Sequence, residues 1–294
     1  MGERAGLPPA VGFVGLGRMG TPMVQRLAAA GVAVRGYDTA SRPELAGVVT
    51  LVQEAALVAD GMPVVVLMLP DSAAVEAVAR GAGLLDALAP GTVLVDMGSS
   101  EPLRTRALAE EVAARGAVLV DAPVSGGVSG ATAGTMTIMV GGPEDVVAPL
   151  GPFFAVLGRM RHVGPVGAGH ALKALNNLMS AAHLLASSEA LLAGQRFGLD
   201  PAVMLDAVNG SSGRSGSTEN KWPNFVLPGT FDSGFALGLM LKDIRIALGL
   251  AEATGAPSAL AARTVELWTE AAAALGPAAD HTEIVRWLRQ ERGG

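Results

Sequence analysis

The stretch VGFVGLGRMG, Val11 to Gly20, decides the architecture of the first half of the chain. It opens with a short apolar run, which is typical of a buried strand. Three glycines, Gly15, Gly17 and Gly20, then follow in G-x-G-x-x-G spacing. A strand that turns through glycines into a helix is the first unit of a βαβ fold, so the stretch predicts a parallel α/β sheet.

The same glycines predict a binding site for the phosphates of a dinucleotide. Gly15 permits the tight turn, Gly17 lets the backbone approach a pyrophosphate, and Gly20 allows close packing of the helix. The free N–H groups of the helix start, around Arg18 and Met19, face the anion. A tight turn without a ligand is the alternative for an isolated match.

Asp38 bears on the choice of cofactor. It ends the second apolar run, VAVRGYD from Val32, and lies about 20 residues past the glycine loop, where an acid can bind a ribose 2′-hydroxyl. Its charge repels the 2′-phosphate of NADP, whereas nearby Arg42 softens that preference. We therefore expect NAD as the cofactor, with NADP possible. The alternative for Asp38 is an ordinary turn former.

The remaining sequence divides into two halves. Apolar runs that begin at Pro63, Thr92 and Ala117 alternate with helical patterns, as in parallel strands covered on both faces. Helical patterns alone make up the second half. We predict an α/β chain with an N-terminal doubly wound Rossmann domain over residues 1–164 and an all-α domain over residues 165–294.

Composition excludes several classes of function. The chain has 294 residues, a net charge of -6 and no cysteine, which argues against nucleic-acid binding, an anionic membrane surface and any thiolate or disulfide site. Its apolar runs are too short to span a bilayer, and its first residues carry no signal-peptide core. The four histidines lack metal-ligand spacing, so no metal is expected. We expect a cytoplasmic protein without nucleic-acid or membrane partners.

Two polar residues interrupt an apolar helical pattern early in the second half. GAGHALKALNN, Gly167 to Asn177, carries Lys173 and Asn177 four positions apart, on one face of a helix. This pair can serve a substrate. Alternatively, the ammonium of Lys173 reaches solvent along the helix surface.

A glycine-rich turn follows the run that begins at Ala117. In DAPVSGG, Ser125, Gly126 and Gly127 come just after the carboxyl end of a strand, where open α/β sheets bind ligands. A serine hydroxyl and glycine N–H groups can hold a carboxylate. An ordinary glycine-rich connection is the alternative.

Four motifs, in this order, resemble a known family. GFVGLGRMG, DAPVSGG, GAGHALKALNN and LMLKD are similar to the signatures of the β-hydroxyacid dehydrogenases, the family of 3-hydroxyisobutyrate dehydrogenase. The resemblance runs from about Val11 to about Leu250. It implies an NAD(P)-dependent oxidoreductase that transfers a hydride between nicotinamide and a small 3-hydroxy acid or semialdehyde. It also implies a homodimer or homotetramer.

The resemblance implies roles for individual residues. Lys173 would be the catalytic general acid/base, exchanging a proton with the substrate hydroxyl. Ser125, Gly126 and Gly127 would bind the substrate carboxylate, beside Asn177. Cofactor contacts would come from Gly15, Gly17, Arg18, Met19, Gly20, Asp38, Leu69, Pro70, Ser99 and Lys242.

One motif departs from the family, and three other functions remain open. The chain reads DMGSS from Asp96, where relatives often have Asp-x-Ser-Thr, so a hydroxyl is lost at Gly98. An NADPH-dependent semialdehyde reductase, an imine reductase and a non-catalytic dinucleotide sensor are the alternatives. Asp38 counts against the first and Lys173 against the second, and the complete set with Ser125 and Asn177 counts against the third.

Residues 209–235 are expected to form a long polar and aromatic insertion between helices. Long loops in compact domains are often functional. We expect this insertion to shape the acyl side of the substrate pocket or a subunit contact, with a plain surface connection as the alternative.

Overall fold

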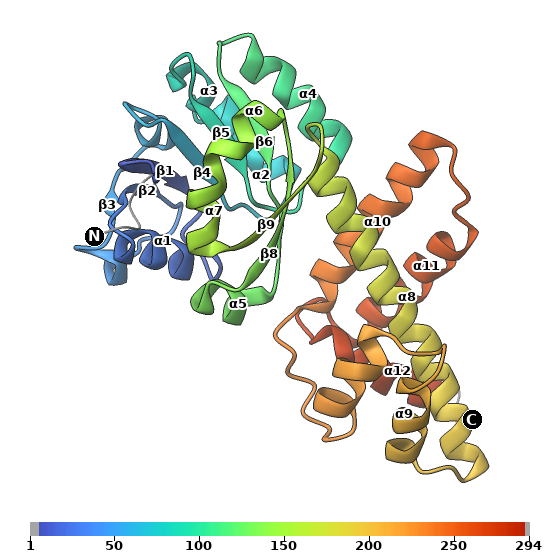
Figure 1. Cartoon of the computed structure of the whole chain (residues 1–294). Coiled ribbons are helices and arrows are strands. Elements are labelled where there is room, and N and C mark those ends of the chain that lie inside the picture. Colours follow the sequence, from blue (N-terminus) through green and yellow to red (C-terminus); the bar gives the residue numbers. More distant parts are fainter. Residues whose placement is uncertain (1–5, 292–294) are drawn as a thin grey trace. The chain divides into compact units, whose positions relative to one another are not determined.

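The computed structural model describes residues 6–291 and divides the chain into two compact units, Met1–Lys173 and Ala174–Gly294 (Figure 1). The division falls inside helix α8, Ala168–Phe197. The sequence places its boundary slightly earlier, at residue 164, where strand β9 ends. Each unit contains its own hydrophobic core.

Unit 1 is built on one sheet with the strand order β3-β2-β1-β4-β5-β6-β8-β7, and β9 pairs with β8. The strands from β3 to β6 are parallel. The chain proceeds outward from β1 in both directions, so the order reverses between β1 and β4, where doubly wound sheets bind ligands. The strands are β1 Ala10–Val14, β2 Ala33–Tyr37, β3 Thr50–Leu51, β4 Val64–Leu67, β5 Val93–Asp96, β6 Val118–Asp121, β7 Val124–Ser125, β8 Met136–Gly141 and β9 Gly158–Gly164.

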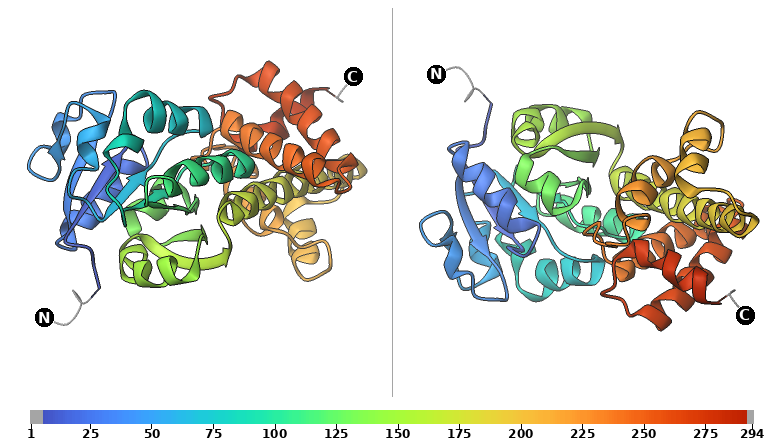
Figure 2. Two further views of the ribbon diagram at one scale, coloured as in Figure 1. Left: turned by 90° about the horizontal axis from the view of Figure 1, so that it is seen from above. Right: turned by 90° about the horizontal axis from the view of Figure 1, so that it is seen from below.

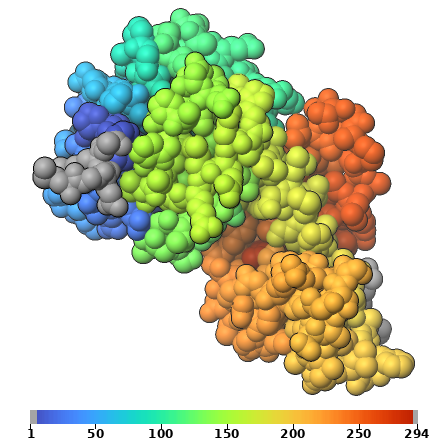
Figure 3. Space-filling model, in the orientation of Figure 1, coloured from blue at the N-terminus to red at the C-terminus, as the bar shows by residue number. Residues whose placement is uncertain are grey.

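The expectation of a wholly parallel sheet is wrong at one end. Strand β8 runs antiparallel to β6 and β7, and β9 then lies parallel to β8. The sequence did not predict these two strands because neither is a continuous apolar run. Strand β9 carries the outward-facing charges Arg159 and Arg161, as a half-solvated outer strand does. This part of unit 1 belongs to the yellow-green surface in Figure 3.

Side chains alternate between the two faces of the sheet and bury both of them. Phe13 packs with helices α1 (Gly20–Ala29) and α7 (Gly151–Leu157), whereas its neighbour Val14 packs with helices on the other face. Both sets of helices are visible in Figure 2. Helix α5 (Gly127–Ala133) contacts α1, and the opposite face is covered by α2 Ser72–Glu76, α3 Leu84–Ala87 and α4 Pro102–Ala113. The doubly wound expectation is therefore confirmed.

Unit 2 is helical throughout its described residues, apart from one isolated bridge between Ala236 and Asp280. Helix α8 ends at Phe197, where Gly198 takes a φ of 102°, and Asp200 caps the next helix by accepting from Ala202 and Val203. The other elements are α9 Pro201–Asn209, η5 Ser217–Val226, α10 Leu237–Thr254, α11 Ala259–Leu275, η6 His281–Glu283 and α12 Ile284–Glu291.

The segment 209–235 is not the loop that the sequence predicts. Its central part, η5, is a π-helix, and Trp222 is fully buried in the core of unit 2. The Trp222 indole N–H donates to Ser188 Oγ over 3.1 Å, so its polar atom is satisfied within the core. The segment is therefore a structural part of this unit. Across residues 6–291, no helix combines the length and the apolar character needed to cross a membrane.

Candidate active site

The glycine loop after β1 has the geometry of a close backbone approach. Gly15 has a φ of 94°, and a Cβ there would collide with the carbonyl oxygen of Met68. A Cβ at Gly20 would collide with the carbonyl oxygen of Gly15. At Gly17, by contrast, the nearest atom to a Cβ would be Arg42 Nη2 at 3.9 Å. Gly15 and Gly20 are thus needed for the turn, and Gly17 borders open space, which fits a ligand phosphate.

Helix α1 begins directly after this loop. Thr21 Oγ1 donates to the Leu16 carbonyl over 2.7 Å, which fastens the first turn to the loop. Neither a capping side chain nor an acidic residue occupies the helix start, whose N-cap is Met19. The N-terminal N–H groups and the positive end of the helix dipole therefore remain suited to an anion.

Asp38, just past β2, lies against the glycine loop. Its Oδ2 accepts from the Leu16 backbone N–H at 2.7 Å and faces Arg42 Nη2 at 3.3 Å, and its Oδ1 accepts from the Ala40 N–H at 2.8 Å. The carboxylate therefore supports the loop as well as standing where the sequence predicts ribose recognition.

Predicted cofactor residues also follow the two neighbouring strands. Leu69 and Pro70 come just after β4, and Ser99 comes after β5. Since β1, β4 and β5 are adjacent and parallel, these residues lie at the same sheet edge as the glycine loop. A Cβ at Gly98 would lie 2.5 Å from the Leu69 carbonyl oxygen, so the glycine in DMGSS lets the two loops approach closely.

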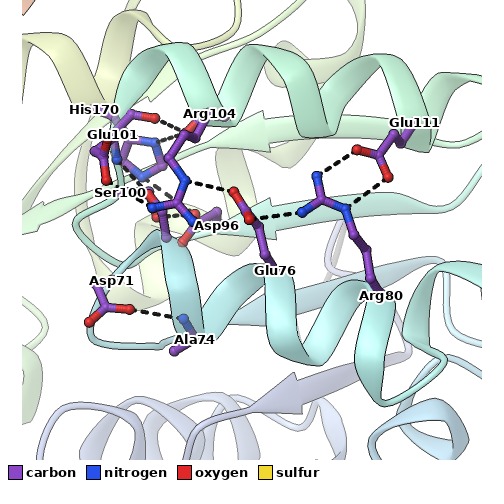
Figure 4. Close-up of polar contacts among 12 residues, drawn as sticks. Asp71, Ala74, Glu76, Arg80, Asp96, Ser100, Glu101, Arg104, Glu111 and His170 are labelled. Atoms are coloured by element: carbon purple, nitrogen blue, oxygen red, sulfur yellow. Dashed lines mark hydrogen bonds and ion pairs between the residues drawn. The ribbon is translucent and has the colours of Figure 1, made fainter.

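The turn after β5 is organised by Asp96, which the sequence did not single out. Its Oδ1 accepts from the Gly98 N–H at 2.9 Å and its Oδ2 from Ser100 Oγ at 2.7 Å. His170 Nε2 lies 3.7 Å from the same Oδ2, and His170 Nδ1 lies 2.9 Å from Thr105 Oγ1 (Figure 4). His170 is 1% exposed and so has a structural position in unit 1.

Asp121 joins the two segments that the sequence assigns to the substrate. Its Oδ1 accepts from the Gly167 N–H at 2.6 Å and its Oδ2 from the His170 N–H at 2.8 Å, so the carboxylate anchors the start of helix α8. Burial raises the pKa of Asp121, and these N–H groups act in the opposite direction. Asp121 begins the DAPVSGG stretch that leads to Ser125, while α8 carries Lys173. The sequence did not predict this role.

The turn with Ser125 leaves backbone N–H groups accessible. Gly126 has a φ of 130° and Gly127 a φ of 62°, values that an L side chain rarely adopts. Both glycines are exposed, and a Cβ at Gly127 would meet no atom within 4 Å. Ser125 ends β7 and is half-buried. This arrangement is compatible with the predicted carboxylate site, which the structure does not test.

Lys173 and Asn177 are both buried, with exposed fractions of 8% and 5%, one turn apart on α8. Lys173 therefore does not extend into solvent, which was the alternative. Asn177 Nδ2 donates to Asp243 Oδ2 on α10 over 2.6 Å. Lys242 Nζ lies 3.4 Å from Asp243 Oδ1, an ion pair without hydrogen-bond geometry. Asp243 is a site residue that sequence reasoning missed, although it stands next to Lys242 in LMLKD.

Comparison with known proteins accounts for this arrangement. The family model for the NAD-binding domain of 6-phosphogluconate dehydrogenase matches residues 10–167, and that described as NAD-binding of NADP-dependent 3-hydroxyisobutyrate dehydrogenase matches residues 167–288. The chain is 39% identical over 264 residues to 2-(hydroxymethyl)glutarate dehydrogenase of Eubacterium barkeri, covering 88% of this chain and 87% of that protein. The chain belongs to the β-hydroxyacid dehydrogenase family.

Two further relatives agree. The mitochondrial 3-hydroxyisobutyrate dehydrogenase of Bos taurus is 34% identical over 295 residues, covering 96% of this chain and 87% of that enzyme. The solved structure of Mycobacterium tuberculosis 3-hydroxyisobutyrate dehydrogenase with L-serine has a TM-score of 0.90 and 30% identity, and the match covers 96% of this chain and 100% of that one.

Membership of the β-hydroxyacid dehydrogenases makes the chain an NAD(P)-dependent oxidoreductase. The predictions of family, fold class, enzyme class and cofactor class are thereby confirmed. The individual site residues and the domain boundary stay predictions. Between residues 6 and 291, no three His, Cys, Asp or Glu side chains gather in a group that could hold a metal ion.

Proposed function

We propose that the protein interconverts a small 3-hydroxy acid and its semialdehyde with NAD, and that Lys173 is the general acid/base. The observation that carries this proposal is the buried pair of Lys173 and Asn177 on one face of α8, with Asn177 fixed by Asp243. The relatives support the substrate class. 2-(Hydroxymethyl)glutarate, 3-hydroxyisobutyrate and L-serine all carry a hydroxymethyl group on the carbon next to a carboxylate.

The residues of this chain divide the chemistry between them. A bound nicotinamide supplies hydride transfer at the carbinol carbon. Lys173 takes the hydroxyl proton in oxidation and returns it in reduction. Asn177 orients the hydroxyl without adding charge, since its amide is held by Asp243. Ser125 and the N–H groups of Gly126 and Gly127 bind the carboxylate and so fix which substrate atom faces Lys173.

Residues of the sheet edge would hold the cofactor. The glycine loop and the start of α1 receive the pyrophosphate, and Asp38 receives the adenosine ribose. Leu69, Pro70 and Ser99 line the nicotinamide half, and Lys242 reaches the nicotinamide. The open space at Gly17 is the feature of the structure that fits this arrangement.

A second candidate is an NADPH-dependent reductase of short semialdehydes. Arg42 favours it, because its guanidinium lies 3.3 Å from Asp38 and could bind a 2′-phosphate. Asp38 itself favours NAD, and we therefore rank the NAD-dependent enzyme first. An imine reductase or a sensor without catalysis leaves the burial of Lys173 unexplained.

We also propose a cytoplasmic homodimer or homotetramer without nucleic-acid or membrane partners. An exposed apolar stripe on α8 supports self-association. Leu172, Leu175 and Met179 recur at helical spacing there, and Met179 is 52% exposed.

The deciding experiment measures NAD and NADP reduction with 3-hydroxyisobutyrate, 3-hydroxypropionate, L-serine, D-glycerate and 4-hydroxybutyrate. We expect turnover of at least one 3-hydroxy acid with NAD. 4-Hydroxybutyrate serves as the control because its hydroxyl is one carbon too far from the carboxylate. Binding of NAD without turnover of any 3-hydroxy acid would overturn the proposal.

A further inference from the structure

A second lysine lies beside the face of α8 that carries Lys173 and Asn177. Lys221, on the π-helix η5, donates from Nζ to Ser180 Oγ over 2.6 Å. Ser180 follows Asn177 by three residues and Lys173 by seven on the uninterrupted helix α8. Positions i, i+4 and i+7 share one face of an α-helix, so these three side chains form a polar stripe on an otherwise apolar helix.

The surroundings of Lys221 do not provide the counter-ion that a desolvated ammonium requires. Within the described part of the chain, the neutral hydroxyl of Ser180 is its hydrogen-bond partner, and no carboxylate lies within ion-pair distance. Burial lowers the pKa of Lys221 to about 8, and the more distant Asp280 offsets only part of this effect. A charge removed from water without a partner is unfavourable, so a bound anion would stabilise it.

The nearby titratable groups, Asp280 and His281 at η6, are engaged elsewhere. Asp280 accepts from Ser233 Oγ at 2.8 Å and from the Gly234 N–H at 2.9 Å. Burial, and then the charge of Lys221, lowers the pKa of His281 to about 4, so the imidazole is neutral at neutral pH. Neither group neutralises the ammonium by direct contact.

We propose that Lys221, together with Ser180, binds a second carboxylate of the substrate, so that the preferred substrates are 2-(hydroxymethyl) dicarboxylic acids. This inference rests on the proposed function, since it needs the substrate hydroxyl at Lys173. The Cα atoms of Lys173 and Ser180 are separated by about 10 Å of helix rise. Two long lysine side chains extend from the ends of this span, which suits a short dicarboxylate lying along the stripe.

The experiment compares two substrates that differ in the distal carboxylate, 3-hydroxyisobutyrate and 2-(hydroxymethyl)glutarate. Wild-type protein is expected to favour the dicarboxylate in kcat/KM by about 10-fold or more. Lys221→Gln removes the charge and is expected to raise KM for the dicarboxylate by about 10- to 100-fold, as expected for a lost charged hydrogen bond. The KM for 3-hydroxyisobutyrate should change less than about threefold.

Arg263→Gln is the matched control. It removes one cation from the surface of unit 2, where Arg263 pairs with Glu266 over 2.8 Å, and should alter neither substrate. Equal losses on both substrates, or none on either, would overturn the role of Lys221. A wild type that turns over 3-hydroxyisobutyrate but does not prefer the dicarboxylate would overturn that role as well. Failure of the wild type on every 3-hydroxy acid would instead overturn the proposed function.

A second measurement does not depend on the folding of the variant. In wild-type protein, KM for 2-(hydroxymethyl)glutarate should rise as the pH passes about 8, where Lys221 loses its charge. Asp280 and His281 have both lost their protons well below this pH. The ratio of the two KM values removes any effect common to both substrates, including that of Lys173. A ratio constant from pH 7 to pH 9 would overturn the inference.

Discussion

The amide of Asn177 donates a 2.6 Å hydrogen bond to Oδ2 of Asp243, and both residues are almost fully buried. The contact connects α8 to α10 within unit 2. It fixes the orientation of an amide that would otherwise rotate, and leaves Asn177 Oδ1 accepting from Asn176 Nδ2 at 3.2 Å. A pre-oriented amide loses less entropy on binding a substrate hydroxyl.

Asp243→Ala should therefore lower kcat/KM for a 3-hydroxy acid by about 5- to 150-fold, since an unsatisfied buried donor costs about 1–3 kcal/mol. Asp243→Asn offers an amide oxygen at the same place and should lose much less. Steady-state kinetics of the two variants provide the comparison. Equal losses in both would show that the carboxylate charge, rather than the acceptor, is what matters.

Lys173→Ala should reduce turnover by about 100-fold or more while leaving NAD affinity nearly unchanged, because it removes the proton acceptor but no residue of the glycine loop. Calorimetric titration with NAD and kcat measurement test the two halves of this prediction. The control is Lys221→Gln with 3-hydroxyisobutyrate, which removes a lysine from unit 2 outside the reacting centre. Turnover close to that of the wild type in Lys173→Ala would remove the assignment.

Asp38→Asn should shift the preference from NAD toward NADP by about 10-fold in the ratio of kcat/KM values, since a charge close to a 2′-phosphate is worth about 1–2 kcal/mol near the surface. The amide oxygen of asparagine can still accept from the Leu16 N–H, so the loop should keep its shape. Kinetics with both cofactors measure the ratio. An unchanged ratio would mean that Asp38 serves only to support the loop.

Gly17→Ala and Gly20→Ala should have different effects. A methyl group at position 17 meets no close protein atom, so the variant should fold normally but bind NAD more weakly. A methyl group at position 20 collides with the Gly15 carbonyl and should destabilise the fold, by about 1–3 kcal/mol for an overpacked site. Thermal unfolding and NAD titration separate the two effects. A normal NAD affinity in Gly17→Ala would place the pyrophosphate elsewhere.

The stability of unit 2 should depend on His281. Its pKa falls from an ordinary 6.5 to about 4, mainly through burial, so the unfolded chain takes up a proton first as the pH decreases. The contribution of a neutral His281 is thus present above pH 6.5 and is lost as the pH falls toward 4. Between pH 7 and pH 5 this amounts to about 2 kcal/mol of unfolding free energy. His281→Gln should reduce the loss measured by urea unfolding, whereas the exposed His183→Gln should not.

Much of the fold could be predicted because local signals and burial agree. Gly15 and Gly20 are glycines for steric reasons that their spacing already indicates, and Asp200 caps its helix as its position before Pro201 suggests. Strand β9 could not be predicted because an outer strand with Arg159 and Arg161 lacks the continuous apolar run of a central strand.

The site was predictable only in part, for a physical reason. Lys173 and Asn177 are conspicuous because charged and amide groups are unusual on an apolar helix face. Their partners are not local in sequence. Asp121 reaches the start of α8 from the end of β6, and Asp243 meets Asn177 from α10, so spacing along the chain carries no sign of either contact. Lys221 was hidden for another reason, since a polar segment read as a loop is in fact a helix with a buried tryptophan.

The uninterrupted course of α8 limits how this protein can be recombined with its relatives. The helix starts on the carboxylate of Asp121 in the first unit and supplies Asn177 to Asp243 in the second. A chimera joined at residue 164 would receive Lys173 and its helix from one parent and the carboxylate that anchors them from the other. Exchange of modules between family members therefore has no neutral seam at this boundary, and functional hybrids should require Asp121, Gly167 and Gly169 to be inherited together.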